Sequence, residues 1–246
     1  MNTTATFSRC LTYLETQIGP QSARPSTTRA PTITLSRMTG SGGIDVADKL
    51  AEILQARRPA QPAPWTVFHA ALIEKVIADH HLPKDFSKFM PENRVSYIED
   101  TLEELFGLHP SSSAMITQIA ETILRLAELG NCILVGRGAH VVLARLDSVL
   151  SVRLIGSLER RIQRVAGIQK IEPEQAREFI RTEDGARRRY LKTYFDSDIA
   201  DPLNYDLVLN TDDFGVDGCA EVIAGAVMTR FPKGAERATT RNVIAG

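Results

Sequence analysis

The chain has 246 residues, of which 43% are hydrophobic and 24% charged, and its formal net charge at pH 7 is −1. This is the composition of a globular protein long enough for one large domain or two small ones. A near-neutral chain has no overall field that attracts it to nucleic acid or to a membrane surface, so we expect neither as a partner.

Cysteine, histidine and hydropathy patterns exclude further classes of protein. Cys10, Cys132 and Cys219 lack the spacing of a zinc site and the density of a secreted disulfide framework. The five histidines form no metal-ligand pattern, so we expect no metal site built from them. No uncharged run approaches the about 18 apolar residues of a spanning helix, and no secretion signal is recognisable at the start. These features predict a cytoplasmic protein.

The two ends of the chain differ from its middle. Residues 1–30 are predicted to form an extension in which residues 7–18 have helical apolar spacing and residues 19–31 form a flexible linker. A short helix in this extension could dock on another protein, so a protein partner is one possibility. Residues 232–246 are predicted to be a disordered tail.

Strand-like and helix-like segments alternate between these ends. We expect strands at 32–36, 65–68, 131–135, 151–155 and 205–210. We expect helices from about residue 44 to 57 and at 70–81, 93–106, 112–129, 157–169, 172–195 and 216–230. Apolar strands that alternate with helices predict an α/β protein with a parallel sheet covered on both faces. Ligands of such sheets bind beyond the carboxyl ends of the strands.

A glycine-rich turn, Arg37 to Gly43 (RMTGSGG), follows the first predicted strand and opens the first helix. Bare backbone N–H groups and a helix N-terminus together bind phosphate in this context. Alternatively, the glycines only close a tight turn. The full phosphate-loop pattern, G-x-x-x-x-G-K-[ST], is incomplete. When it is aligned on Gly42, its first glycine falls on Arg37, its lysine on Gly43 and its hydroxyl residue on Ile44.

A second candidate is Arg137, which lies between Gly136 and Gly138 directly after the predicted strand at 131–135. A guanidinium at the carboxyl end of a strand can bind a phosphate through two parallel hydrogen bonds. The alternative is an ordinary surface arginine in a turn.

Arginines are concentrated in the two helices predicted between residues 157 and 195. In the first helix Arg160 and Arg164 share a face, with Arg161 beside them; in the second, one stripe holds Arg177, Arg181, Asp184 and Arg188, with Arg187 adjacent. Most charged runs are solvated, but we expect two or three of these arginines to turn inward over transferring phosphates. Few aromatic residues interleave with them, which disfavours a nucleic-acid interface.

Taken together, four segments make the chain resemble the cytidylate kinase-like family, a P-loop branch related to nucleoside monophosphate kinases, over about residues 31–231. The segments are ITLSRMTGSGG, LAELGNCILVGRGAHVVL, VRLIGSLERRIQRV and EDGARRRYLKTYFDSDIADPLNYDLVLNT. The resemblance implies a three-layer α/β fold, a nucleoside monophosphate-binding insertion near residues 65–110 and an arginine-rich lid at 157–195. It also implies ATP as donor, with Mg²⁺.

Site residues carry over from the family by position. The resemblance implies that Gly40, Ser41, Gly42 and Gly43 bind the donor phosphates. From their own chemistry we also expect Thr39, through its hydroxyl, and Arg37, through its charge, to bind the donor. The resemblance places Arg137 on the acceptor phosphate and Asp184 and Arg187 on the acceptor nucleotide. It matches Arg160, Arg161 and Arg164 with the start of the lid. We therefore expect the catalytic cations to be Arg137, Arg160, Arg164 and Arg187.

Three departures from the family pattern open a second hypothesis. Gly43 replaces the loop lysine, Gly138 replaces the aspartate of a Gly-Arg-Asp sequence, and Phe68-His69-Ala70 replaces a Tyr/Phe-Asp-Arg sequence. Arg37 or a lid arginine could offset one of these losses. The first hypothesis is a phosphotransferase that acts on a nucleoside monophosphate or a similar acceptor. The alternative is a catalytically degenerate relative that binds a nucleotide, or nothing, and acts through a protein partner.

Overall fold

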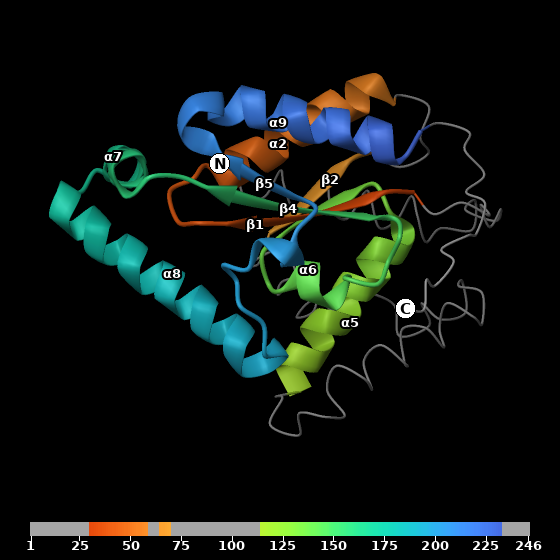
Figure 1. Cartoon of the computed structure of the whole chain (residues 1–246), viewed down its shortest axis with the longest axis horizontal. Coiled ribbons are helices and arrows are strands. Elements are labelled where there is room, and N and C mark those ends of the chain that lie inside the picture. Colours follow the sequence, from red (N-terminus) through yellow and green to blue (C-terminus); the bar gives the residue numbers. More distant parts are fainter. Residues whose placement is uncertain (1–29, 59–63, 70–113, 233–246) are drawn as a thin grey trace, which may run out of the picture.

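The predicted strands form one parallel sheet in the order β2-β3-β1-β4-β5 (Figure 1). The computed structural model describes residues 30–58, 64–69 and 114–232. Within these residues the strands are β1 (Thr32–Arg37), β2 (Thr66–His69), β3 (Cys132–Val135), β4 (Val149–Ile155) and β5 (Leu207–Asn210). Their apolar runs are nearly continuous because both faces of the sheet are covered.

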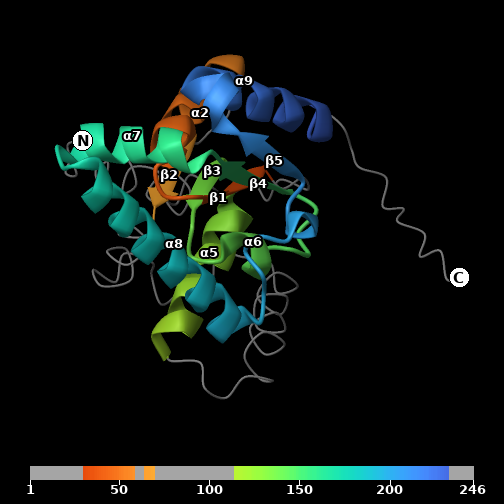
Figure 2. The ribbon, with the colours of Figure 1, turned by 60° about the vertical axis from the view of Figure 1, so that its left-hand side comes forward.

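Helices cover the sheet on both faces, which confirms the three-layer α/β prediction (Figures 1 and 2). One face carries α2 (Gly43–Arg57) and α9 (Thr211–Arg230), and the other carries α5 (Ala114–Leu129) and the short α6 (Ala139–Val142). Two further helices, α7 (Leu158–Gln169) and α8 (Pro173–Phe195), pack against each other. The end of α8 also contacts the core on the α5 face, through Tyr190, Tyr194 and Phe195.

The helix after the glycine turn is fixed by one apolar stripe. Val46, Ala47, Leu50 and Leu54 lie at the spacing of a single helix face and are completely buried against the sheet and α9. Each buried leucine contributes about 2 kcal/mol of hydrophobic stabilisation. This packing anchors the helix N-terminus, and with it the turn, at the carboxyl edge of the sheet.

The strand order brings two loops together. Since β1 pairs with β3 in parallel register, with Leu35 opposite Val135, the turn after β1 and the turn after β3 begin side by side. Gly136 N donates a hydrogen bond to Leu35 O at 3.2 Å. The chain runs from β1 to one side of the sheet and later crosses from β3 over β1 to β4, so this edge is the switch point where ligands of such sheets bind.

Several predicted boundaries were wrong. The last helix begins at Thr211 rather than near 216, because the Asn210 side chain accepts a hydrogen bond from Asp212 N and acidic residues occupy the first turn. Its two parts meet at Gly215, whose backbone is non-helical. The last strand begins at Leu207 rather than Tyr205, and α6 was not predicted. The helices expected at 70–81 and 93–106, most of the 65–110 insertion and nearly all of both predicted ends lie outside the described residues.

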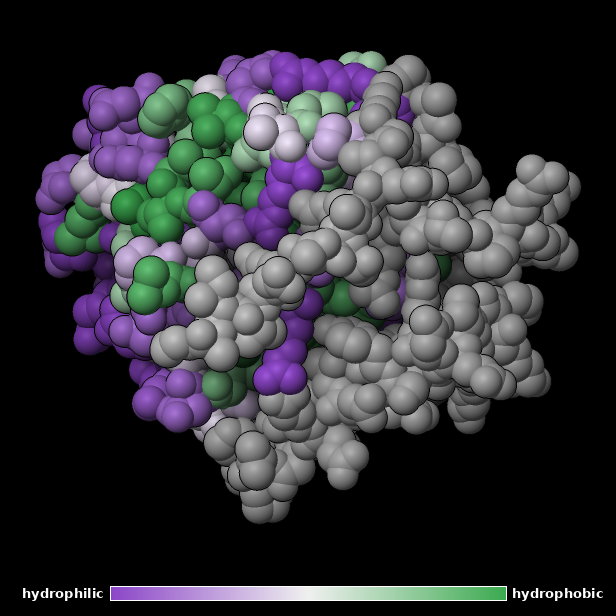
Figure 3. Space-filling model, turned by 45° about the vertical axis from the view of Figure 1, so that its right-hand side comes forward, coloured by the Kyte–Doolittle hydropathy of each residue, from purple (hydrophilic) through white to green (hydrophobic). Residues whose placement is uncertain are grey.

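The exposed apolar side chains come from many elements instead of one patch. Among the described residues they are Ile44, Met115, Ile168, Phe179, Leu203, Val208, Phe214 and Val222. Figure 3 shows hydrophobic and hydrophilic residues intermixed over the described part of one face. None of the described helices has the length and apolar character needed to cross a membrane.

Candidate functional site

The glycine turn folds back on itself between β1 and α2. Ser41 contacts Met38 O twice, through its backbone N at 3.2 Å and its Oγ at 2.9 Å. Gly40 and Gly42 adopt left-handed φ angles of 81° and 78°, which favour glycine. Gly42 caps α2, and the N–H groups of the helix's first turn have no partner within the helix, so the turn presents donors and a positive helix end to an anion.

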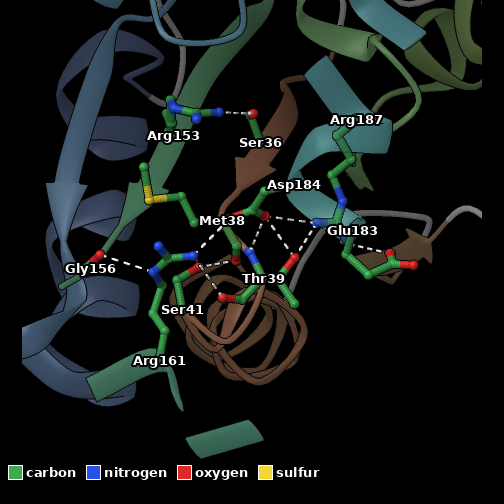
Figure 4. A network of polar contacts seen from close by, with 10 residues as sticks. All are labelled: Ser36, Met38, Thr39, Ser41, Arg153, Gly156, Arg161, Glu183, Asp184 and Arg187. Atoms are coloured by element: carbon green, nitrogen blue, oxygen red, sulfur yellow. Dashed lines mark hydrogen bonds and ion pairs between the residues drawn. The ribbon is translucent and has the colours of Figure 1, made fainter. Parts of the chain in front are cut away.

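A carboxylate from α8 holds the turn from one side. Asp184 Oδ1 accepts hydrogen bonds from Thr39 N at 2.8 Å and Thr39 Oγ1 at 2.7 Å (Figure 4). Asp184 also pairs with Arg161 Nη1 at 2.7 Å and Arg187 Nη1 at 3.1 Å, and Arg187 pairs with Glu183 at 3.1 Å. We call these five residues the Asp184 cluster. Each of its arginines faces a carboxylate, so the cluster joins α7 and α8 to the turn with its charge already balanced.

Helix α7 lies directly over the turn. A Cβ atom on Gly40 would lie 2.7 Å from Arg161 O, and one on Gly42 would lie 2.7 Å from Arg164 Nη1. Arg164 in turn pairs with Asp45 of α2 at 3.2 Å. The glycines are therefore needed for the close approach of α7, whereas phosphate binding by the turn stays a prediction.

On the other side of the turn, a cavity of about 330 Å³ opens at the carboxyl edge of the sheet. Three arginines from separate elements line it: Arg37 at the end of β1, Arg137 in the turn after β3, and Arg187 on α8. Its apolar wall includes Tyr190, Leu191 and Ile199. A small cavity that combines an apolar wall with several cations suits a small anionic ligand.

Arg37 differs from the arginines of the Asp184 cluster. Its guanidinium has no hydrogen bond or ion pair to any residue in the described part of the chain. Burial, followed by the charges of Arg187 and Arg137, lowers its pKa from 12.5 to about 10. A cation held beside two others, with no paired carboxylate, would be stabilised by a bound anion.

The turn after β3 is left-handed over three residues. The φ angles of Gly136, Arg137 and Gly138 are 88°, 55° and 72°. For arginine this conformation is uncommon and costs on the order of 1 kcal/mol. It directs Arg137 to the cavity, where its guanidinium lies 5.9 Å from the Tyr190 ring centroid. The structure thus places Arg137 on the cavity wall, while its phosphate contact remains a prediction.

Gly138 is more than a missing aspartate. A Cβ atom there would lie 2.8 Å from Phe195 Cε2 and 3.2 Å from Leu191 Cδ2. The side chains of α8 therefore fill the space that an aspartate at this position would need.

A buried polar network that borders the cavity was not predicted. Arg153 donates to Ser36 Oγ at 2.8 Å and lies 5.6 Å from the Tyr205 ring. The hydroxyl of Tyr205 donates to Ile199 O at 3.0 Å and lies 3.3 Å from Nε2 of His140. Burial, and then Arg153, lower the pKa of His140 from 6.5 to about 4. The one sequence signal for this network was a charged residue, Arg153, inside an apolar strand.

The structure separates the predicted site residues into two groups. Thr39, Asp184 and Arg187 meet at the turn, and Arg37 and Arg137 meet Arg187 at the cavity. Arg160 and Arg188 are exposed, and Arg177 and Arg181 pair with Glu174 and Glu178 on their own helix. The inward residue of the first arginine group is Arg161, and Arg164 lies over Gly42.

The described residues do not fit a protein-held Mg²⁺ site. They contain no group of three His, Cys, Asp or Glu side chains that could hold a metal ion. The position that carries a metal-binding hydroxyl in the P-loop pattern is Ile44, and the neighbouring Asp45 carboxylate is paired with Arg164.

Comparisons with known proteins identify the family of this chain. The model of the Cytidylate kinase-like family matches residues 32–213. Cytidylate kinase of Methanoculleus marisnigri is 30% identical over 118 residues, 48% of this chain and 63% of that protein. Cytidylate kinase of Thermococcus sibiricus is 32% identical over 133 residues, 54% of this chain and 66% of that protein. The chain thus spans just under two thirds of each curated relative.

A solved structure shows the same fold. An uncharacterized protein from Eubacterium ventriosum superposes with a TM-score of 0.56 at 19% identity, covering 82% of this chain and 99% of that one. At this identity the similarity shows the fold alone.

Proposed function

We propose that this protein, which belongs to the cytidylate kinase-like family, is a P-loop kinase that transfers the γ-phosphoryl group of ATP to a nucleoside monophosphate or a similar small acceptor. The observation that carries the proposal is convergence: Arg37, where the glycine turn begins, lines one cavity on the carboxyl edge of the sheet together with Arg137 and Arg187. Arg187 also contacts Thr39 of the turn. Phosphoryl transfer requires mainly positioning and neutralisation of charge, which backbone donors and arginines supply.

In this proposal the donor binds at the glycine turn and the acceptor binds in the neighbouring cavity. The donor phosphates bind the N–H groups of the turn and of the α2 N-terminus, and the acceptor phosphate binds Arg137 and Arg187. An acceptor oxygen attacks the γ-phosphorus and forms the new P–O bond. The bond from the γ-phosphorus to the β–γ bridging oxygen breaks, and its electron pair leaves with ADP. No covalent enzyme intermediate is needed, and no step depends on a protein-bound metal. Any Mg²⁺ would arrive with the phosphates of ATP.

The remaining assignments follow from family membership and stay proposals. We place the kinase-like domain at residues 31–231, its nucleoside monophosphate-binding insertion near 65–110 and its lid at 157–195. The Asp184 cluster, which joins α7 and α8 to the turn, supports a lid in this position. Because α8 fills the space beside Gly138, we propose that residues elsewhere read the acceptor base. A cytoplasmic location stays a prediction.

Binding and turnover test this function directly. Titration calorimetry with ATP, with and without Mg²⁺, and then with CMP is expected to show micromolar affinity. An assay of ADP formation over a panel of phosphorylated acceptors is expected to identify the acceptor. Arg137→Ala should abolish turnover, and Arg181→Ala, which removes an exposed arginine paired on its own helix, should leave it unchanged. If the purified protein neither binds a nucleotide nor forms ADP, the proposal is wrong.

A second candidate function is a nucleotide-binding or regulatory protein without turnover. It is favoured by Gly43 and Ile44, which stand where the P-loop pattern has a lysine and a hydroxyl residue. Such a protein would act on a partner, for which residues 1–30 are the proposed contact. ATP binding without ADP formation on any acceptor would select this candidate over the kinase.

A further inference from the structure

The side chain of Arg37 passes over the position that the loop lysine occupies in the P-loop pattern. A Cβ atom on Gly43 would lie 2.8 Å from Arg37 Cγ and 3.0 Å from Arg37 Cβ. A longer side chain at position 43 would therefore start inside the stem of Arg37. Arginine at 37 and lysine at 43 exclude each other in this arrangement. We therefore treat the absence of the lysine and the presence of Arg37 as a single exchange of one cation for another.

A second glycine makes room for the end of the same side chain. A Cβ atom on Gly136 would collide with Nη1 of Arg37. Gly136 opens the turn that carries Arg137, on the acceptor side of the proposed site. Arg37 thus runs from the donor turn, at Gly43, to the acceptor turn, at Gly136, with its guanidinium on the cavity wall.

The charge of Arg37 indicates what its end is for. Arg161 and Arg164 each face a carboxylate at 2.7 and 3.2 Å, whereas Arg37 has no hydrogen bond or ion pair to another described residue. Burial, and then the charges of Arg187 and Arg137, lower the pKa of Arg37 by more than Glu183 and Asp184 raise it. Folding therefore places a cation where an added anion would balance it.

We propose that Arg37 binds the transferring phosphoryl group and takes the part of the loop lysine, reaching that group from the end of β1 instead of from α2. This assignment rests on the proposed kinase function and deepens it. A guanidinium is planar and offers several N–H donors, so it can contact a donor and an acceptor oxygen together. The lost lysine is then no evidence of a degenerate site.

A four-protein comparison tests the exchange: wild type, Arg37→Ala, Gly43→Lys and the double variant R37G/G43K. Removing one hydrogen-bonding charge from a phosphate should weaken ATP affinity and turnover by about 10- to 150-fold in Arg37→Ala. Gly43→Lys alone should lose as much, because the new side chain starts against Arg37. The double variant, which rebuilds the glycine and lysine of the P-loop pattern, should recover at least tenfold over either single variant.

Two measurements test the role of Arg37 separately from the proposed kinase activity. Tripolyphosphate, which carries the phosphates of ATP without the nucleoside, should raise the melting temperature of wild type and of the Arg181→Ala control. It should not raise that of Arg37→Ala. Since Arg37 makes no hydrogen bond or ion pair with a described residue, Arg37→Ala should melt no lower than wild type when the ligand is absent, which a structural role would not allow.

The outcomes are distinct. If wild type forms ADP and Arg37→Ala matches it, the Arg37 assignment is wrong and the kinase function stands. If no acceptor yields ADP but tripolyphosphate protects wild type and not Arg37→Ala, the kinase function fails and Arg37 still marks a phosphate site. If Gly43→Lys behaves like the Arg181→Ala control, the exchange is refuted.

Discussion

Arginines lie on both sides of the glycine turn, in the Asp184 cluster and at the cavity, but they differ in whether a carboxylate pairs with them. In the Asp184 cluster, Arg161 and Arg187 are paired with carboxylates at 2.7 to 3.1 Å. At the cavity, Arg37 has no such pair within the described part of the chain and a pKa lowered to about 10. Arg187 and Glu183 belong to both sides, since they pair with each other in the Asp184 cluster and also line the cavity.

The difference separates stability from binding. Pairs in the Asp184 cluster satisfy their own charge, so their removal should damage the fold. An unpaired buried cation destabilises the folded state and gains a partner only when an anion binds. Residues of the first kind hold the turn, and those of the second kind are available to a ligand.

The largest effect is expected from breaking the paired side. Asp184→Asn removes the shared negative charge, leaves Arg161 short of its counter-charge and weakens the hold on Thr39. The free energy of unfolding should fall by about 3 kcal/mol, because a partly buried charge is left uncompensated. Urea denaturation measures this, with Glu174→Gln, which breaks an exposed pair, as the matched control. An unchanged urea midpoint in Asp184→Asn would mean that the cluster does not hold the turn.

Lowering the pH should show how much a charge on His140 destabilises the folded protein. The pKa of His140 is about 4 in the folded protein against 6.5 unfolded, so the unfolded chain binds the proton first as pH falls. The contribution of neutral His140 to the free energy of unfolding is complete above about pH 6.5 and is lost as the pH falls toward 4. The total loss is about 3 kcal/mol. The unfolding free energy of wild type should therefore fall more steeply over this range than that of His140→Gln. Parallel curves would show that His140 takes up its proton in the folded protein at ordinary pH.

Neutralising Arg37 should have a smaller effect of opposite sign. Arg37→Met keeps an unbranched apolar stem and removes the charge. Since the lowered pKa of Arg37 is about 10, its cost to the folded state is fully present at pH 7 and diminishes only above pH 10. Thermal unfolding should show a gain of about 1 kcal/mol. A loss of stability would reveal a structural contact of Arg37 and end the contrast between the two sides.

The smallest effect is expected from a substitution outside both the Asp184 cluster and the cavity. Arg181 lies on the exposed face of α8 and pairs only with Glu178, one turn away, where solvent screens the charge. Arg181→Ala should leave the melting temperature, nucleotide affinity and turnover unchanged within the error of each measurement. A clear drop in any of them would extend the site along α8.

Local sequence patterns determined the order of the elements and predicted the edge of the sheet at which the candidate site lies. Apolar runs predicted the five strands to within a few residues, and glycines predicted both turns at the carboxyl edge. These features depend on neighbouring residues, whose alternation, capping and backbone freedom are readable in sequence. The start of α9 was predicted too late. The Asn210 cap and the acidic first turn allow a helix to begin at Thr211, before the non-helical Gly215.

The tertiary structure alone decided which charges meet. The stripe predicted on α8 reaches the turn only through Asp184, since a straight helix meets a loop along about one of its turns. Asp184 is 145 residues from its partner Thr39, and Arg37 reaches Gly136 only because β1 lies beside β3. Residue type and spacing fix how a segment folds. Whether an arginine is paired, exposed or held ready for an anion depends on neighbours that strand order and helix packing bring from distant parts of the chain.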